Sequence, residues 1–221
     1  MKKQFLIYLF ILTTSVVSAQ LYEAGAFIGG SNYIGDIGPT TYINPNRIAY
    51  GLVGKFNFTP RITFRGTFIY TNLQFDDTKA DDPFRVNRGF KHSNKILEGA
   101  VGIEFSFLKY SLSKIGYSHT PYIIAQAGAV NYAAIDTNGE AKRVTSIALP
   151  FGIGYKMRLA ENVGIALETS FRYTFKDNID GNNHDVLGLN FGDPNDNDWY
   201  VFTGITVVYA FGRPGCYKGR F

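Results

Sequence analysis

Large apolar residues alternate with small or polar residues in repeated segments of about ten residues, and this alternation constrains the fold more than any other feature. In the clearest segment, 48–58, one face carries Ile48, Tyr50, Leu52, Gly54, Phe56 and Phe58. A period of two is that of a β-strand whose two faces meet different surroundings. Similar segments recur at 62–70, 97–107, 147–157, 163–175 and 199–211, with weaker ones at 21–30 and 121–132. We therefore expect eight strands, and we find no segment with the period of a helix.

The composition also favours strands. The chain has 24 Gly, 15 Tyr and 19 Phe, and aromatic residues are enriched in strands. It has one cysteine, so no internal disulfide can hold the fold together. Sheet pairing and burial must therefore supply the stability of what we expect to be one domain.

The first 19 residues have the order of a secretory signal peptide. Lys2 and Lys3 precede an apolar run, 5–17, and a small residue, Ala19, ends the segment. A buried N-terminal helix is the alternative, but the flanking residues follow the signal order. We expect the mature chain to begin at Gln20, without a lipoprotein anchor, because no cysteine follows the cleavage site. Without the two lysines the chain has 20 basic and 18 acidic residues, too even a balance to predict a nucleic-acid partner.

The connections between the expected strands alternate in length. Those at 59–60 and 159–162 are short and the one at 108–120 is longer, whereas the others are long and polar, at 31–47, 72–95, 133–143 and 176–198. Short turns on one side and long loops on the other are typical of outer-membrane barrels, which close so that no backbone group is left unpaired in lipid. We predict an all-β, eight-stranded antiparallel transmembrane barrel in the bacterial outer membrane, with both termini in the periplasm. A soluble periplasmic barrel or sandwich is the alternative, and its large apolar faces would point inward.

This topology divides the chain into a signal peptide at 1–19, a barrel at 20–211 and a periplasmic tail at 212–221. Aromatic residues near strand ends would form two girdles at the membrane surfaces. We expect Tyr22, Tyr70, Tyr132 and Trp199 at the loop ends, and Phe58, Phe107 and Phe211 at the turn ends.

If the aromatic faces meet lipid, eight charged residues point into the lumen: Glu23, Lys55, Arg65, Glu98, Glu104, Lys156, Glu168 and Arg172. The set has four acids and four bases, and eight strands enclose only enough room for side chains. Buried charges at this density must pair. We expect interior ion pairs that fill the barrel instead of an aqueous channel. The alternative is that these charges form a solvated face.

The sequence offers little chemistry for catalysis or ligand binding. His92, His119 and His184 all fall in expected loops, and none has a nucleophile and an acid at a motif spacing. The run 193–198 is rich in oxygen ligands and could bind calcium, but it lacks EF-hand spacing, so a solvated loop is the better interpretation. We predict a protein that is not an enzyme and has no cofactor, metal or small-molecule substrate.

The chain carries two distinctive terminal motifs, "YEAGAFIGGSNYIGDIG", which contains "GGSNYIGD" at 29–36, and "GRPGCYK" at 212–218. Together they resemble the motifs of the PorG family of outer-membrane barrels in the type IX (Por) secretion system. The resemblance implies a non-enzymatic part of a protein-export machine. It also implies partners on the periplasmic side, a ring lipoprotein (PorK-like) and its ring partner (PorN-like), which the barrel would tie to the outer-membrane lipid. The alternative function is a surface-binding or adhesion barrel that works through its extracellular loops.

The tail carries the remaining candidate site. Cys216 is unpaired in a chain expected to reach an oxidising compartment, which suggests either a free thiol or an intermolecular disulfide. We expect Cys216 to be the candidate for a disulfide with the ring lipoprotein, and Arg213, Tyr217 and Lys218 to belong to the partner-binding tail. An incidental free thiol is the other interpretation.

Overall fold

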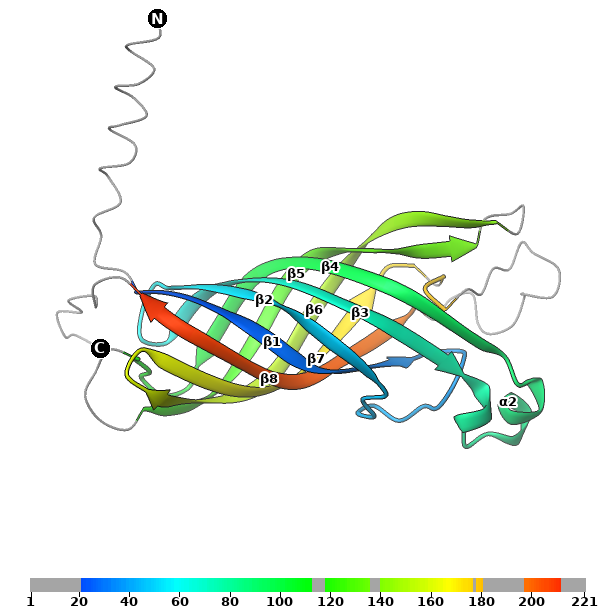
Figure 1. Ribbon diagram of the computed structural model, residues 1–221, viewed down its shortest axis with the longest axis horizontal. Helices are drawn as coiled ribbons and strands as arrows, with labels where there is room; N and C mark the ends of the chain where they lie inside the picture. The colour runs from blue at the N-terminus through cyan, green and yellow to red at the C-terminus, as the bar shows by residue number, and fades with distance from the viewer. Residues whose placement is uncertain (1–20, 113–117, 136–139, 177, 181–196, 212–221) are drawn as a thin grey trace, which may run out of the picture.

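The computed structural model describes residues 21–112, 118–135, 140–176, 178–180 and 197–211, which form a closed barrel of antiparallel strands (Figure 1). Each strand pairs with its neighbour along the chain, and the first strand pairs with the last. The strands are β1 (Leu21–Ile34), β2 (Arg47–Asn57), β3 (Ile62–Asp76), β4 (Lys91–Ser106), β5 (His119–Ile135), β6 (Ala141–Ala160), β7 (Val163–Thr174) and β8 (Trp199–Phe211). The predicted eight-stranded antiparallel barrel is confirmed.

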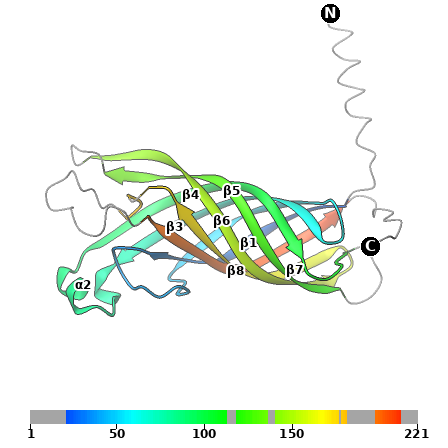
Figure 2. The ribbon, with the colours of Figure 1, turned by 180° about the vertical axis from the view of Figure 1, so that it is seen from behind.

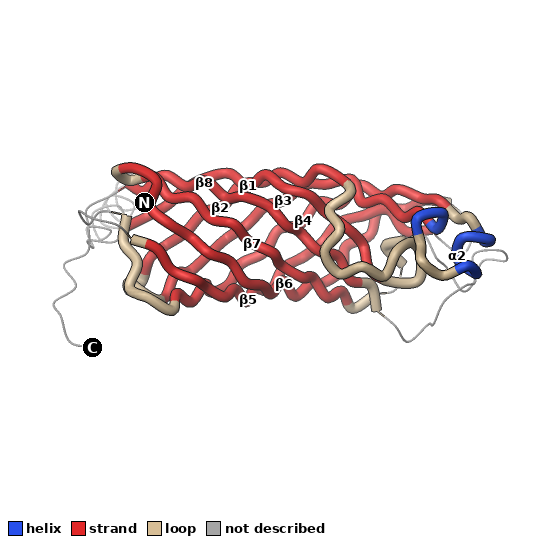
Figure 3. The backbone as a smooth tube through the Cα atoms, turned by 90° about the horizontal axis from the view of Figure 1, so that it is seen from below, coloured by secondary structure: helices blue, strands red, loops and turns tan. Residues whose placement is uncertain are grey.

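The strands cross the long axis of the barrel obliquely, as the tube in Figure 3 shows. Closure joins Tyr22 on β1 to Phe211 on β8, so the first strand begins and the last strand ends at the same end of the barrel. The short connections 58–61 and 161–162 lie at this end, which we call the turn end, and the opposite end is the loop end. Along the part of the barrel to which all eight strands contribute, which we call the shared wall, the closed sheet leaves no strand edge. This is the condition for a β-structure in lipid.

Several strands run farther toward the loop end than the sequence predicted. β3 continues to Asp76 and β4 begins at Lys91, so both enter the expected 72–95 loop. The hairpin of β5 and β6 continues to the pair Ile135–Ala141, although β6 pairs with β7 only from Ala148. The hairpin therefore projects past the shared wall, as Figure 2 shows from behind. In the β3 extension the strand period continues, but polar residues such as Asn72 and Gln74 alternate with Leu73 and Phe75, so the stretch resembles a polar loop in the sequence.

The expectation of no helix was wrong at one place. Between β3 and β4 lie a 3₁₀ turn, η1 (Asp77–Lys79), and a short helix, α2 (Pro83–Arg88). The Asp82 side chain accepts a hydrogen bond from the Phe84 N–H, and Gly89 ends the helix in the left-handed region at φ 62°. Six residues are too few to show a helical period. In the described part of the chain, no helix is long and apolar enough to span a membrane.

The barrel is apolar outside, and its interior contains both polar and apolar side chains. Its exposed large residues include Ile48, Leu52, Phe68, Val101, Ile147, Ile153 and Leu167. Its buried polar residues include all eight of the charges predicted to face the lumen. A soluble barrel would not expose large apolar residues along most of its wall, so the exterior argues against the soluble alternative.

The aromatic girdles were predicted only in part. Tyr22 lies at the turn end, where its ring is 5.3 Å from Phe56 and 6.0 Å from Phe211, because β1 begins there. Tyr132 points inward and is fully buried, so it belongs to no girdle. Trp199 lies at the loop end as expected, with its ring 5.0 Å from Tyr173.

Candidate functional site

A cluster of buried charges fills the turn half of the lumen, and Glu104 of β4 lies at its centre. Its carboxylate lies 2.8 Å from the Lys55 ammonium and 3.3 Å from the Arg65 guanidinium, and it also accepts a hydrogen bond from Lys156. These cations come from β2, β3 and β6, and all four side chains are at most 5 % exposed. One carboxylate thus ties four of the eight strands together across the barrel.

A second carboxylate, Glu168 of β7, completes this cluster. Arg65 binds it through two parallel hydrogen bonds of 2.7 and 2.8 Å, and Tyr122 donates a third of 2.7 Å. Bidentate pairs of this kind are among the strongest polar contacts in proteins and fix the orientation of both partners. Glu23 differs from the prediction. It accepts a hydrogen bond of 2.7 Å from Asn57 and has no cation within ion-pair distance among the described residues.

A separate pair lies closer to the loop end. The Arg172 Nε group is 3.3 Å from Glu98, and its Nη1 group donates to the Ser170 carbonyl at 2.6 Å. Tyr200 donates to the other oxygen of Glu98, and the Arg172 guanidinium lies 4.2 Å from the centre of the Phe202 ring. The predicted lumen charges are therefore all buried, and all but Glu23 form ion pairs.

The loop half of the lumen contains an apolar core that the sequence analysis missed. Its members are fully or almost fully buried and include Phe27, Ile69, Leu73, Phe75, Ile96, Val130, Tyr132, Ile179 and Phe202. Several of them lie in strand extensions that were expected to be loop, so their inward positions were not considered. Extending the alternation of β3 from Ile69 through Thr71 to Leu73 and Phe75 would have found part of this core. The lumen is thus filled by ion pairs at one end and by packed apolar side chains at the other.

The connection after β4 closes the turn end. The sequence predicted a longer connection at 108–120, and its residues Tyr110 and Leu112 turn into the barrel mouth. Both pack against Val208 and Ala210 of β8, and Leu112 is completely buried. The Tyr110 ring centre lies 4.5 Å from the Lys156 ammonium, so a cation–π contact joins this connection to the charge cluster.

The loop end is fastened by polar contacts that start in the "GGSNYIGD" segment. The hydroxyl of Tyr33 donates to Asp180 at 3.0 Å and also to Asp198, so β1 holds both ends of the last long loop. The amide of Asn32 donates to the carbonyls of Thr41 and Tyr42 at 3.3 and 3.2 Å. The motif behind the family resemblance therefore has a structural role at this end.

Asp77 provides a second fastening. Burial raises the pKa of its carboxyl, but hydrogen bonds from Arg88 and from the backbone of Gly38 and Phe90 outweigh burial and hold that pKa below its usual value. The Arg88 guanidinium also donates to the Asp36 carbonyl at 2.8 Å. The first and second long loops are thereby joined into one cap.

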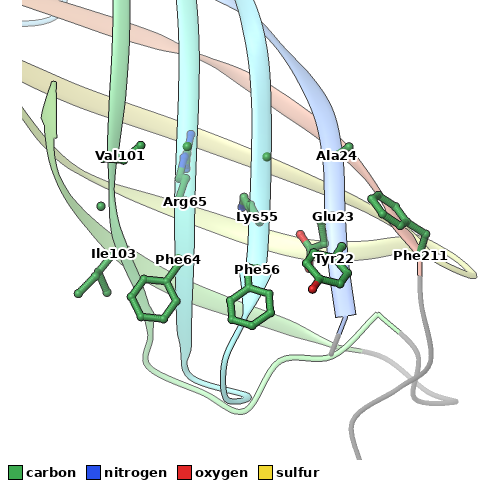
Figure 4. Close-up of a pocket in the computed structure, with 13 residues that line it drawn as sticks. Tyr22, Glu23, Ala24, Lys55, Phe56, Phe64, Arg65, Val101, Ile103 and Phe211 are labelled. Carbon is green, nitrogen blue, oxygen red and sulfur yellow. The ribbon is translucent and has the colours of Figure 1, made fainter. Parts of the chain in front are cut away.

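The outer wall has a shallow depression of about 680 Å³ near the turn end. Figure 4 shows its lower border, where the rings of Tyr22, Phe56, Phe64 and Phe211 lie in a row. Above them, Ala24 pairs with Gly54 and Gly54 with Gly66, so the wall is bare of large side chains. A Cβ added at Gly54 would meet nothing within 4 Å.

The candidate tail residues Arg213, Cys216, Tyr217 and Lys218 lie outside the described residues, as do the signal peptide and 193–196 of the possible calcium loop. Asp198 ends that loop and serves as an acceptor for Tyr33 and the Ile179 backbone. Among the described residues no group of His, Cys, Asp or Glu side chains could hold a metal ion. His119 contacts Tyr155, and His92 stacks on Phe75 with ring centres 6.0 Å apart.

Comparison with solved structures returns small outer-membrane barrels at low identity. Ail of Yersinia pestis, solved with the heparin analogue sucrose octasulfate, is 14 % identical with a TM-score of 0.44, over 87 % of this chain and 99 % of Ail. Neisserial surface protein A is 13 % identical with a TM-score of 0.45, over 87 % and 95 %. A major outer-membrane protein of Thermus thermophilus is 12 % identical with a TM-score of 0.47, over 87 % and 100 %.

No curated protein matches the sequence. A protein-family match covers residues 2–220, which is nearly the whole chain. The chain belongs to the family described as "Domain of unknown function (DUF6089)".

Proposed function

We propose that this protein is a non-enzymatic barrel of the bacterial outer membrane that anchors the periplasmic PorK/PorN ring of the type IX secretion system. In this proposal the loop end faces the outside and the turn end faces the periplasm. The partners are the outer-membrane lipid, the ring lipoprotein and its ring partner, and the residues nearest to them follow Phe211 at the turn end.

The observation that carries the proposal is a closed wall that is apolar outside and filled inside. The apolar exterior suits lipid, and the closed sheet satisfies the backbone without water. The lumen holds ion pairs, a packed core and the inserted residues Tyr110 and Leu112, so it offers no path for a protein substrate. A barrel that cannot conduct cargo supports a role as an anchor, and the terminal motifs specify which machine it would serve.

Deletion of 212–221 tests the anchor role. The truncated and full-length proteins would be compared for heat-modifiable migration on gels, which reports barrel assembly, and for export of cargo carrying the type IX signal. We expect normal assembly with reduced export, because the deletion leaves every described strand intact. Normal assembly with unchanged export would contradict an anchor role for the tail.

The proposed disulfide of Cys216 has its own test. Non-reducing gels of membranes should show a reducible, slower band for the native protein, and Cys216→Ser should abolish it. Mass spectrometry of that band should identify the ring lipoprotein. A native protein without any reducible band would leave the thiol free and remove the disulfide from the proposal.

The ordered loop end favours a second candidate, a surface-binding barrel. The cap joined by Asp77 and Arg88 carries Phe84 at 75 % exposure and Tyr42 at 69 % exposure, and exposed aromatic side chains on ordered loops are suited to protein contacts. Phe84→Ser would leave secretion intact under the anchor proposal. A loss of surface attachment with normal secretion would favour this second function.

A further inference from the structure

The outward face of β4 to β6 at the loop end is basic. Lys95 on β4 and Arg143 on β6 are both exposed and point away from the lumen. Lys91 also faces outward but forms an ion pair of 3.5 Å with Asp76. The outward positions of these three strands contain no Asp or Glu. Lys95 and Arg143 are therefore two cations with no acidic residue on the outward face of these three strands. We call them the rim pair.

The two cations lie on opposite sides of one strand. The side-chain amide of Asn94 donates to the Ala133 carbonyl at 2.6 Å and accepts from the Ala133 N–H at 3.0 Å, which holds β5 beside β4. Ala133 in turn pairs with Arg143. The backbone pairing of β4 with β5 ends at Leu97 and Asn131, so at the level of Lys95 the Asn94 side chain joins the two strands instead of a backbone ladder. Lys95 and Arg143 are therefore more widely separated than two ordinary strand spacings of about 4.8 Å, and their long side chains have to converge over Ala133. The methyl group of Ala133 between them leaves space for a group that both side chains can reach.

The rim pair lies directly above the apolar wall. Leu97 follows Lys95 by two positions on the same face, and Ile147, which is 61 % exposed, follows Arg143 by four. Asn131 of β5 lies between Arg143 and the apolar wall, and it accepts a hydrogen bond of 2.7 Å from the Arg143 Nε group. This bond orients the guanidinium through Nε, so its Nη groups can serve another acceptor. Charged side chains at this height meet the headgroup layer if the wall below meets lipid tails.

The aromatic girdle also changes in this sector. At the loop end β2 and β3 carry Tyr50 and Tyr70, whose rings are 5.4 Å apart, and β7 and β8 carry Tyr173 and Trp199. The girdle continues onto β6 through Phe151, whose ring lies 5.9 Å from that of Trp199. Farther toward the loop end, the described outward positions of β4 to β6 carry the rim pair and no aromatic ring. Aromatic side chains suit any interfacial headgroup, whereas two exposed cations select an anionic one.

We propose that the rim pair binds the phosphate of an anionic lipid in the leaflet next to the loop end. Arg143 supplies the planar N–H groups that recognise phosphate oxygens, and Lys95 supplies a second positive charge. The inference rests on the proposed membrane placement but not on any role in secretion. In the proposed orientation the lipid is a phosphorylated glycolipid of the outer leaflet.

The test is lipid binding to the full-length protein refolded in detergent, followed by native mass spectrometry. The probes are a bisphosphorylated lipid A, the same lipid with its phosphates removed, and inorganic phosphate. Each basic residue near a membrane surface contributes about 1 kcal/mol, so K95A/R143A should bind the phosphorylated lipid about 30-fold more weakly. K142A is the matched control because Lys142 is also exposed, adjoins Arg143 and points to the other face. It should change binding less than about twofold.

Three results would overturn the proposal. They are equal binding of the phosphorylated and dephosphorylated lipids, unchanged binding by K95A/R143A, and equally tight binding of inorganic phosphate, which would show that the lipid is not the ligand. Heat-modifiable migration checks that each variant is folded. Failure of the native protein to insert into lipid vesicles would instead refute the membrane placement itself, so the two failures are distinguishable.

Discussion

Replacement of Glu104 by Gln removes the central charge of the lumen while keeping the shape of the side chain. In the native barrel the cluster balances Lys55, Arg65 and Lys156 against Glu104, Glu168 and the nearby Glu23. The substitution leaves three buried cations against two acids. A buried charge that loses its partner is strongly destabilising, because the remaining charge keeps its desolvation penalty.

The magnitude follows from the distances. With an effective dielectric constant of about 20, the attraction of Glu104 to Lys55 at 2.8 Å is about 6 kcal/mol, and to Arg65 at 3.3 Å about 5 kcal/mol. Removing the charge also removes its own desolvation penalty of several kcal/mol, and the amide keeps some hydrogen bonds. We therefore expect Glu104→Gln to lower the free energy of unfolding by about 3–5 kcal/mol.

Urea titration of the refolded protein, monitored by the fluorescence of its single tryptophan, measures this change. Trp199 lies on the wall at the loop end, away from Glu104, so the substitution does not alter the reporter. Glu161→Gln is the matched control, because Glu161 is exposed in the turn between β6 and β7 and should change stability by less than about 0.5 kcal/mol.

A double variant separates charge imbalance from loss of packing. Lys55→Met combined with Glu104→Gln restores equal numbers of cations and acids, so the double variant should be more stable than the sum of the single effects by about 1–3 kcal/mol. A Glu104→Gln protein within about 1 kcal/mol of native, or strictly additive single effects, would refute the reasoning that the lumen depends on paired charge.

Three further predictions concern the wall, the plug and the cap. Gly54→Ala should stabilise the barrel by about 0.5–1 kcal/mol, whereas Gly128→Ala should destabilise it because its Cβ would lie 2.3 Å from a backbone oxygen; the same urea titration compares them. Leu112→Ala should cost about 2 kcal/mol yet open no ion path, since the charge cluster still fills the lumen; planar-bilayer conductance would contradict this if steady current appeared. Because the pKa of Asp77 is lower in the folded protein, its ionised carboxylate stabilises the cap above the unfolded-state pKa of about 4, and this stabilisation is lost as the pH falls through the folded-state pKa. Hydrogen exchange of the Phe90 N–H, which bonds to Asp77, should therefore accelerate only below about pH 4. Acceleration already at about pH 6 would contradict this assignment.

The pairing of the predicted charges shows where sequence reasoning stops. The inward position of Arg65 follows from alternation along β3 alone. Its partner Glu168 lies 103 residues away on β7, and only the curvature of the closed wall brings the two side chains together. Glu23 illustrates the converse, because it is the register neighbour of Lys55 but bonds to Asn57 while Lys55 reaches across to Glu104.

The ends of the barrel were the least predictable part. Leu112 looks like one apolar residue in a polar connection, and its burial depends on the open barrel mouth beneath it. Ile179 likewise enters the core from a loop that the sequence marks as solvated. In both cases the apolar side chain is buried by strands that are remote in sequence, so no local pattern records the contact.

The sequence by itself determined the number of strands, the facing of their central residues and the apolar exterior, because a period of two is a local property of each segment. The tertiary structure alone decided the ion-pair partners, the apolar core of the loop half, the inserted residues at both ends and the basic sector of the rim. These features depend on register and on closure between β1 and β8, which join residues far apart along the chain.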